Sequence, residues 1–261
     1  MGPLITLTTD FGAGSGYPAQ MKAVILGAVP GATIVDLSHD VPPFDVLAGA
    51  MLLEACVPWF PDDTVHCAVI DPGVGTARRP LVVVDGAGRR LVGPDNGLFT
   101  PFLDERAKAI EIAKPVGTPR RRSATFHGRD LFAPVAAWLA QGGQPATLGP
   151  MVKDPLRLLW PSANRAGNVV HGECLTSDPF GNITTSIREC DLAGETVLTV
   201  YVGGHPARWA KTFGEGGPGE LLALLGSSGR VEVAMREASA VRVRGIVRRT
   251  PVVVVLRGSD P

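Results

Sequence analysis

The segment that decides the fold runs from Val65 to Arg78 and reads VHCAVIDPGVGTAR. Its first part, up to Ile70, is a mostly apolar run with the length of a buried strand. Asp71 ends that run, a glycine-containing turn follows, and Arg78 returns seven positions later. A carboxylate at a strand end with a cation nearby is suited to holding a small polar reactant. We therefore expect this turn to carry the chemistry of the protein.

Strand and helix patterns alternate around this segment through the first half of the chain. Short β-rich runs are found at 4–9, 32–37, 64–70, 81–84 and 90–92, and apolar residues with helical spacing at 17–29, 46–57 and 130–139. This alternation predicts an α/β fold with a mostly parallel sheet flanked by helices. Ligands of parallel sheets bind beyond the carboxyl ends of the strands, so Asp10, the segment 38–40 and Asp71 should gather at one edge.

The pattern changes from about residue 151 onward. Pro155, Pro161 and the segment 162–164 predict a linker. Short β-branched runs separated by glycine-rich turns then occur at 169–170, 183–185, 197–202, 231–233, 241–243 and 252–256. They predict an all-β domain, a small barrel or sandwich. We expect an N-terminal α/β domain over residues 1–155 and a C-terminal β domain over residues 167–261.

Composition excludes several classes of function for this chain of 261 residues. Lysine plus arginine equals aspartate plus glutamate, 25 each, which argues against binding of nucleic acid or of an anionic membrane. Arg120–Arg122 is a short basic cluster that we interpret as a solvated loop. Cys56, Cys67, Cys174 and Cys190 lack C-x-x-C spacing and are interpreted as buried thiols. Without a leader pattern or an apolar run of about 20 residues, a soluble cytoplasmic protein is expected.

Two polar segments near the N-terminus leave alternatives open. Asp10 precedes a glycine-rich loop in which Tyr17 stands where a dinucleotide-binding loop has its third glycine. The Asp10 carboxylate could accept hydrogen bonds from a ribose diol, or it could cap a turn or helix. Asp36, His39 and Asp40 could be metal ligands, although capping and turn roles are more common for such residues.

Three later segments also admit two interpretations each. Gly93–Gly97 is interpreted first as a turn, and a functional role for Asp95 or Asn96 is the less common alternative. Phe126–Asp130 contains a histidine that could relay a proton or be structural. Asp178–Asn182 could contact the edge and face of a purine, or form a β-turn around a buried phenylalanine.

Together these motifs resemble one family. TDFG, DPGVGT with its arginine, GPDNG, FHGRD, DPFGN and SSG occur in the order found in the S-adenosylmethionine hydroxide adenosyltransferases, relatives of the bacterial fluorinase and chlorinase. The resemblance implies an N-terminal α/β domain, a C-terminal β-barrel, and a homotrimer with active sites between the N-terminal domain of one subunit and the C-terminal domain of the next. It also implies that S-adenosylmethionine and water give adenosine and L-methionine by displacement at the ribose 5′ carbon, without a cofactor or metal.

The resemblance also implies roles for individual residues. Asp71, Arg78 and His127 would hold the water and take its proton, whereas the halogenases have a tyrosine at the aspartate position and lack the histidine. Asp10 would bind the ribose diol. The full set of implied substrate-binding residues is Asp10, Ser15, Phe44, Phe126, Gly128, Asp178, Phe180, Asn182, Ser227, Glu232 and Met235.

Ser15 departs from the family pattern, because the family usually has an aspartate there, near the methionine ammonium. We expect weaker discrimination for that ammonium, or compensation by another carboxylate. Two other classes of function stay open. One is a metal-dependent hydrolase using Asp10, Asp36, His39 and Asp71, and the other is a non-catalytic protein that binds adenosine or S-adenosylmethionine.

Overall fold

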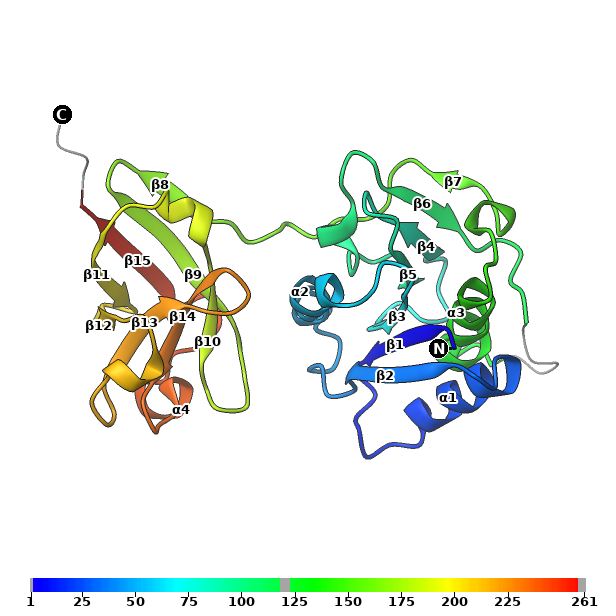
Figure 1. The fold of residues 1–261 in the computed structure, drawn as a ribbon, viewed down its shortest axis with the longest axis horizontal. Helices are drawn as coiled ribbons and strands as arrows, with labels where there is room; N and C mark the ends of the chain where they lie inside the picture. The colour runs from blue at the N-terminus through cyan, green and yellow to red at the C-terminus, as the bar shows by residue number, and fades with distance from the viewer. Residues whose placement is uncertain (1, 118–122, 258–261) are drawn as a thin grey trace. The chain divides into compact units, whose positions relative to one another are not determined.

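The computed structural model describes residues 2–117 and 123–257 of the chain. The chain divides into two units, Met1–Leu159 and Trp160–Pro261, which are described separately (Figure 1). The basic cluster Arg120–Arg122 lies outside the described residues.

The first unit is built on a mixed sheet with the strand order β2-β1-β3-β5-β4-β6-β7 (Figure 1). Its strands are β1 (Leu4–Thr9), β2 (Thr33–Ser38), β3 (Val65–Val69), β4 (Pro80–Val84), β5 (Arg90–Pro94), β6 (Lys108–Glu111) and β7 (Met151–Val152). β1 pairs in parallel with β2 and β3, and β3 pairs in parallel with β5. The pairs β4–β5, β4–β6 and β6–β7 are antiparallel. For β4 and β5 the short turn that joins them requires this arrangement. The expected parallel-rich α/β sheet is confirmed.

Helices cover both faces of this sheet. They are α1 (Tyr17–Ala28), α2 (Val46–Cys56) and α3 (Ala133–Ala140), with a π-helical turn at Gly128–Phe132 and 3₁₀ turns at Val57–Trp59, Thr100–Phe102 and Pro145–Thr147. α1 and α3 pack against each other over β1 and β3 (Figure 1). α2 begins where Asp45 Oδ1 accepts a hydrogen bond from Ala48 N (3.0 Å). Among the described residues, no helix is long and apolar enough to cross a membrane.

Successive side chains of the central strands point to opposite faces of the sheet, so that one face is apolar and the other is partly polar. Ile5 and Leu7 of β1 and Cys67 of β3 are buried in the core formed with α1 and α3. The intervening residues point the other way, toward the face on which α2 packs. There, Thr6 and His66 are fully buried and joined by a 2.8 Å hydrogen bond.

The second unit is a closed β-barrel. Its strands are β8 (Asn164–Ala166), β9 (Val169–Ser177), β10 (Ile183–Arg188), β11 (Val197–Val202), β12 (His205–Trp209), β13 (Leu221–Leu225), β14 (Arg230–Met235) and β15 (Pro251–Leu256). They follow the order β10-β14-β13-β12-β11-β15-β9-β8, and an additional β9–β10 pairing closes the ring while β8 stays outside it. A short helix, α4 (Ala240–Arg244), and 3₁₀ turns at Glu189–Leu192 and Phe213–Glu215 complete the unit. Closure pairs the sheet edges and encloses one apolar core.

Several local expectations differ from the structure. The β-branched run 241–243 forms α4 and not a strand, because Ser239 Oγ caps the helix by accepting from Arg242 N (3.2 Å) and Gly245 ends it at φ 62°. Asn164, expected in the linker, begins β8. The helix expected at 130–139 is a π-helical turn followed by α3. The sequence patterns also missed β6, β7, β12 and β13.

Candidate active site

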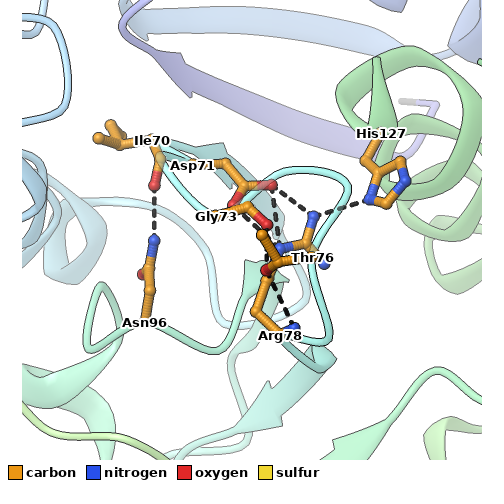
Figure 2. Close-up of polar contacts among 7 residues, drawn as sticks. All are labelled: Ile70, Asp71, Gly73, Thr76, Arg78, Asn96 and His127. Carbon is orange, nitrogen blue, oxygen red and sulfur yellow. Dashed lines mark hydrogen bonds and ion pairs between the residues drawn. The ribbon is translucent and has the colours of Figure 1, made fainter. Parts of the chain in front are cut away.

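The turn after β3 forms a tight ion pair between its two ends (Figure 2). Arg78 Nε donates to both carboxylate oxygens of Asp71, at 2.9 Å to Oδ1 and 3.1 Å to Oδ2, and Nη2 also contacts Oδ2. The Asp71 side chain is 4% exposed and that of Arg78 is 8% exposed. A bidentate contact between two buried side chains fixes the orientation of the Asp71 carboxylate and places a positive charge beside it.

His127 extends this pair into a three-residue chain (Figure 2). Arg78 Nη2 lies 2.8 Å from His127 Nδ1. Because a guanidinium only donates hydrogen bonds, Nδ1 must be the acceptor, and a neutral His127 then carries its proton on Nε2. The guanidinium also lies over the ring of Phe132, with Cζ 5.1 Å from the ring centroid. Arg78 is therefore held by a carboxylate, an imidazole and an aromatic face.

Glycine and threonine shape the turn between Asp71 and Arg78. Gly75 has φ 80°, in the left-handed region that residues with a Cβ rarely adopt. Thr76 Oγ1 donates to Gly73 O (2.7 Å) and accepts from Arg78 N (3.3 Å). These contacts return the chain so that Arg78 faces Asp71.

A cavity of about 430 Å³ lies beside the linked residues Asp71, Arg78 and His127, within the first unit. Its wall is formed by Asp10, Phe11, Tyr17, Pro43, Phe44, Val69, Asp71, Val74, Thr125, Phe126, His127 and Gly128. Asp10 follows β1 and Asp71 follows β3, so the two acids come together beyond the ends of neighbouring parallel strands, as their sequence positions indicate. Arg78 is not among the lining residues; it contacts the two wall residues Asp71 and His127.

Aromatic rings make one side of the cavity. Phe11, Tyr17 and Phe126 pack edge to face, with ring centroids 5.1 to 5.9 Å apart. The Arg129 guanidinium lies over Phe126 at 4.9 Å from its centroid. Phe44 is 71% exposed and has φ 66°, so it presents its ring to the solvent side of the cavity at an unusual backbone angle. These surfaces suit a flat, partly apolar ligand.

Three expected substrate-binding residues of this unit have defined local contacts. Asp10 lines the cavity, and its Oδ2 accepts a hydrogen bond from Phe44 N (2.9 Å), which links the acid to the exposed ring. Gly128 also lines the cavity, and a Cβ there would lie 3.2 Å from the Phe126 ring, so the wall packs closely at this point. Ser15 is not a wall residue; its hydroxyl accepts from Tyr17 N at 3.4 Å.

Of the residues considered as an alternative metal site, Asp10 and Asp71 line the cavity, whereas Asp36 and His39 contact each other and do not line it. His39 Nδ1 lies 2.8 Å from Thr9 Oγ1, and its Nε2 lies 3.1 Å from Asp36 Oδ1. Lys22 binds the other Asp36 oxygen at 2.5 Å; although burial opposes it, hydrogen bonds from Lys22 and His39 lower the pKa of Asp36. Asp40 caps the glycine loop by accepting from Ala13 N (2.8 Å). Within the described ranges, no group of three His, Cys, Asp or Glu side chains is placed to hold a metal ion.

The other expected substrate-binding residues belong to the second unit. Asp178 and Asn182 close a turn, with Asn182 N and Nδ2 each donating to the Asp178 carboxylate at 2.9 Å. Phe180, at the tip of this turn, is 78% exposed, so the interpretation as a turn around a buried phenylalanine is wrong. Glu232 of β14 is half-buried, and burial followed by the charge of Asp178 raises its pKa.

Ser227 and Met235 differ in exposure, although both were expected to contact the substrate. Ser227 is exposed in the turn between β13 and β14, whereas Met235, at the end of β14, is buried in the barrel core. In this unit by itself, the Met235 side chain is a packing residue.

The sequence reading missed two wall aromatics, Phe11 and Tyr17. Both stand beside features that it did identify, since Phe11 follows Asp10 and Tyr17 begins α1 directly after the glycine loop. An aromatic residue at the end of a parallel strand, or at the start of the helix that follows, is the signal that could have found them.

Comparisons with known proteins agree with this geometry. The model of the SAM hydroxide adenosyltransferase N-terminal domain matches residues 5–149, and the model of the C-terminal domain of that family matches residues 172–253. A (R)-S-adenosyl-L-methionine hydrolase of Thermus thermophilus is 41% identical over 94% of this chain and 96% of its own length. A fluorinase of Actinoplanes sp. is 30% identical over 73% of each chain.

A solved structure shares the fold over almost the whole chain. It is that of an uncharacterized conserved protein from Thermotoga maritima, with a TM-score of 0.89 and 33% identity over 96% of this chain and 99% of that one. The two family domains match in order, and the relatives are similar over most of their length. The chain therefore belongs to the SAM hydroxide adenosyltransferase family.

Proposed function

We propose that this protein hydrolyses S-adenosyl-L-methionine to adenosine and L-methionine. The observation that carries the proposal is the chain Asp71–Arg78–His127, whose two ends line a cavity that also offers a carboxylate, Asp10, and several aromatic rings. Relatives that are about 40% identical over most of the chain are named (R)-S-adenosyl-L-methionine hydrolases.

The reaction is a displacement at the ribose 5′ carbon. The oxygen of one water forms a bond to C5′ while the C5′–S bond breaks. The electron pair of the C5′–S bond stays on sulfur, so that the sulfonium becomes the neutral thioether of methionine. The water releases one proton. Because the sulfonium is already a good leaving group, the protein has to hold the water in line with the breaking bond, at about 3 Å from C5′, and receive that proton.

Within the three-residue chain, Asp71 is the group best placed to receive the proton. It lines the cavity, and a carboxylate offers about four acceptor positions, so its contacts with Arg78 leave room for a bond to water. His127 Nδ1 is occupied by Arg78, and protonation of that nitrogen would break the contact. Arg78 holds both wall residues at fixed positions.

The other wall residues fit the rest of the substrate. Asp10 can accept hydrogen bonds from the two ribose hydroxyls, and Phe44 and Phe126 can flank the nucleoside. In the second unit, Asp178, Phe180 and Asn182 are proposed to contact adenine or the methionine end. Their positions on an exposed turn are compatible with that role.

The name of these relatives specifies the configuration of their substrate. Since "L" describes the amino acid carbon, "(R)" refers to the sulfonium centre, and we propose that this protein also prefers the (R) epimer. We also propose a homotrimer in the cytoplasm, on the family resemblance and on the four free cysteines. Sedimentation equilibrium should then give three times the mass of one chain.

Incubation with each epimer, with adenosine and methionine measured by chromatography, tests the function. In ¹⁸O-labelled water the label should enter the adenosine 5′-hydroxyl, because the bond that breaks is C5′–S. Asp71→Asn should reduce kcat about 10²- to 10⁴-fold, the range of a lost general base. Tight binding of S-adenosylmethionine without product would identify a binding protein and refute the hydrolase.

A further inference from the structure

The loop Gly93–Gly97, which the sequence patterns indicate to be a simple turn, contacts both ends of the Asp71–Arg78 turn. Asn96 Nδ2 donates to the carbonyl of Ile70, the residue directly before Asp71, at 2.8 Å (Figure 2). The Asn96 side chain is itself oriented, because its Oδ1 accepts from Leu98 N at 3.2 Å. One end of the catalytic turn is therefore tied to Asn96.

Asp95 ties the other end through Arg79, the neighbour of Arg78. Arg79 Nε and Nη2 bind Asp95 Oδ2 at 2.8 and 2.7 Å, and the backbone N of Asp95 donates to Arg79 O at 2.9 Å. Asp95 is only 3% exposed, and its Oδ1 also accepts from Leu156 N at 2.8 Å. A buried carboxylate with these donors is held firmly.

We propose that Asp95 and Asn96 are positioning residues that set the separation of Asp71 from Arg78. The turn between those two residues contains Gly73 and Gly75, whose backbones are the least restricted, so the hydrogen bonds inside the turn are supplemented by anchors outside it. The two outside anchors are consecutive residues, with Cα atoms about 3.8 Å apart. Two adjacent residues thus bind the residue before Asp71 and the residue after Arg78.

This inference rests on the proposed function and adds a role for two residues that touch neither the cavity nor the reacting groups. A purely structural role would predict loss of stability without a specific loss of turnover. The chain offers a matched control in Asp85, a second buried aspartate of the same sheet. Its carboxylate binds Arg89 at 2.7 Å and accepts two backbone N–H groups, but it lies in the turn between β4 and β5.

The test compares Asp95→Asn, Asn96→Ala and the control Asp85→Asn for kcat, KM and thermal unfolding. A misplacement of the order of 1 Å should lower kcat about 10²-fold in Asp95→Asn and Asn96→Ala, with KM close to that of wild type. Asp85→Asn should lose comparable stability and keep the wild-type kcat. Equal kcat in all three variants would overturn the positioning role while leaving the hydrolase function intact.

A second measurement does not depend on turnover. In a crystal structure of Asn96→Ala, the Asp71 carboxylate should be displaced from the Arg78 guanidinium, and in Asp85→Asn the contact should stay as in wild type. An unchanged Asp71–Arg78 contact in Asn96→Ala would refute the inference. Failure of the wild type to turn over either epimer would instead refute the proposed function.

Discussion

Replacement of His127 by asparagine and by alanine separates two roles that the site geometry allows for this residue. In the structure, His127 Nδ1 accepts a hydrogen bond from Arg78 Nη2 at 2.8 Å. Asparagine keeps an acceptor oxygen close to the position of Nδ1 but cannot accept a proton at neutral pH. Alanine removes both properties. If His127 serves to hold Arg78, asparagine should preserve most of the activity and alanine should not.

The size of the effect follows from the contact that is lost. A hydrogen bond to a charged group contributes about 1.5–3 kcal/mol, so His127→Ala should lower kcat about 10- to 100-fold. His127→Asn should stay within about tenfold of wild type, a difference below about 1.4 kcal/mol. If His127 were the proton acceptor, both variants would lose about 10²- to 10⁴-fold.

The assay is adenosine release under saturating substrate. An asparagine variant as impaired as the alanine variant would contradict this reasoning. Thermal unfolding of both variants checks that the comparison is between folded proteins.

Three further outcomes are expected. Ser15→Asp should lower the KM for S-adenosylmethionine by restoring a negative charge for the methionine ammonium, and an unchanged KM would count against that role. Burial, followed by the charge of Arg89, lowers the pKa of His66 to about 4, below its usual 6.5. As the pH drops, the unfolded chain binds this proton before the folded protein does, so the free energy of unfolding should fall by about 3 kcal/mol between pH 6.5 and 4. Urea titrations at several pH values measure this fall, and His66→Asn should remove most of it. In thiol labelling of the native protein, exposed Cys190 should react, whereas Cys67 and Cys174, whose pKa values burial raises to about 12, should react only after unfolding.

The parts of the fold that the sequence predicts are those in which local pattern and tertiary packing agree. β1, β3 and α1 each bury one continuous apolar stripe, so their periodicity is plain. The run 241–243 misled the prediction because β-branched residues favour strands, while the Ser239 cap and Gly245, only a few residues away, favour a short helix. A search for periodic patterns does not compare the stabilisation by helix-capping residues with the strand propensity of the residues between them.

The site shows a similar division. Asp71 and Arg78 are seven residues apart, and the turn between them makes their contact a local property that the sequence can indicate. His127 comes from a segment 49 residues beyond Arg78, and only the packing of the π-helical turn before α3 brings it to Arg78. From the residues alone it was one candidate among several, and the family resemblance singled it out. Asn96 looked like an ordinary turn residue because its partner, the carbonyl of Ile70, has no signature in sequence.

The placement of Arg78 behind the cavity wall has an electrostatic reason. The substrate carries its positive charge on sulfur, and positive charge also grows on the attacking water until its proton leaves. A guanidinium about 4 Å from either centre would oppose the reaction by about 4 kcal/mol at an effective dielectric constant of 20. Arg78 instead contacts Asp71 and His127 without lining the cavity. In the proposed mechanism, the cation orders these two wall residues without itself facing the substrate.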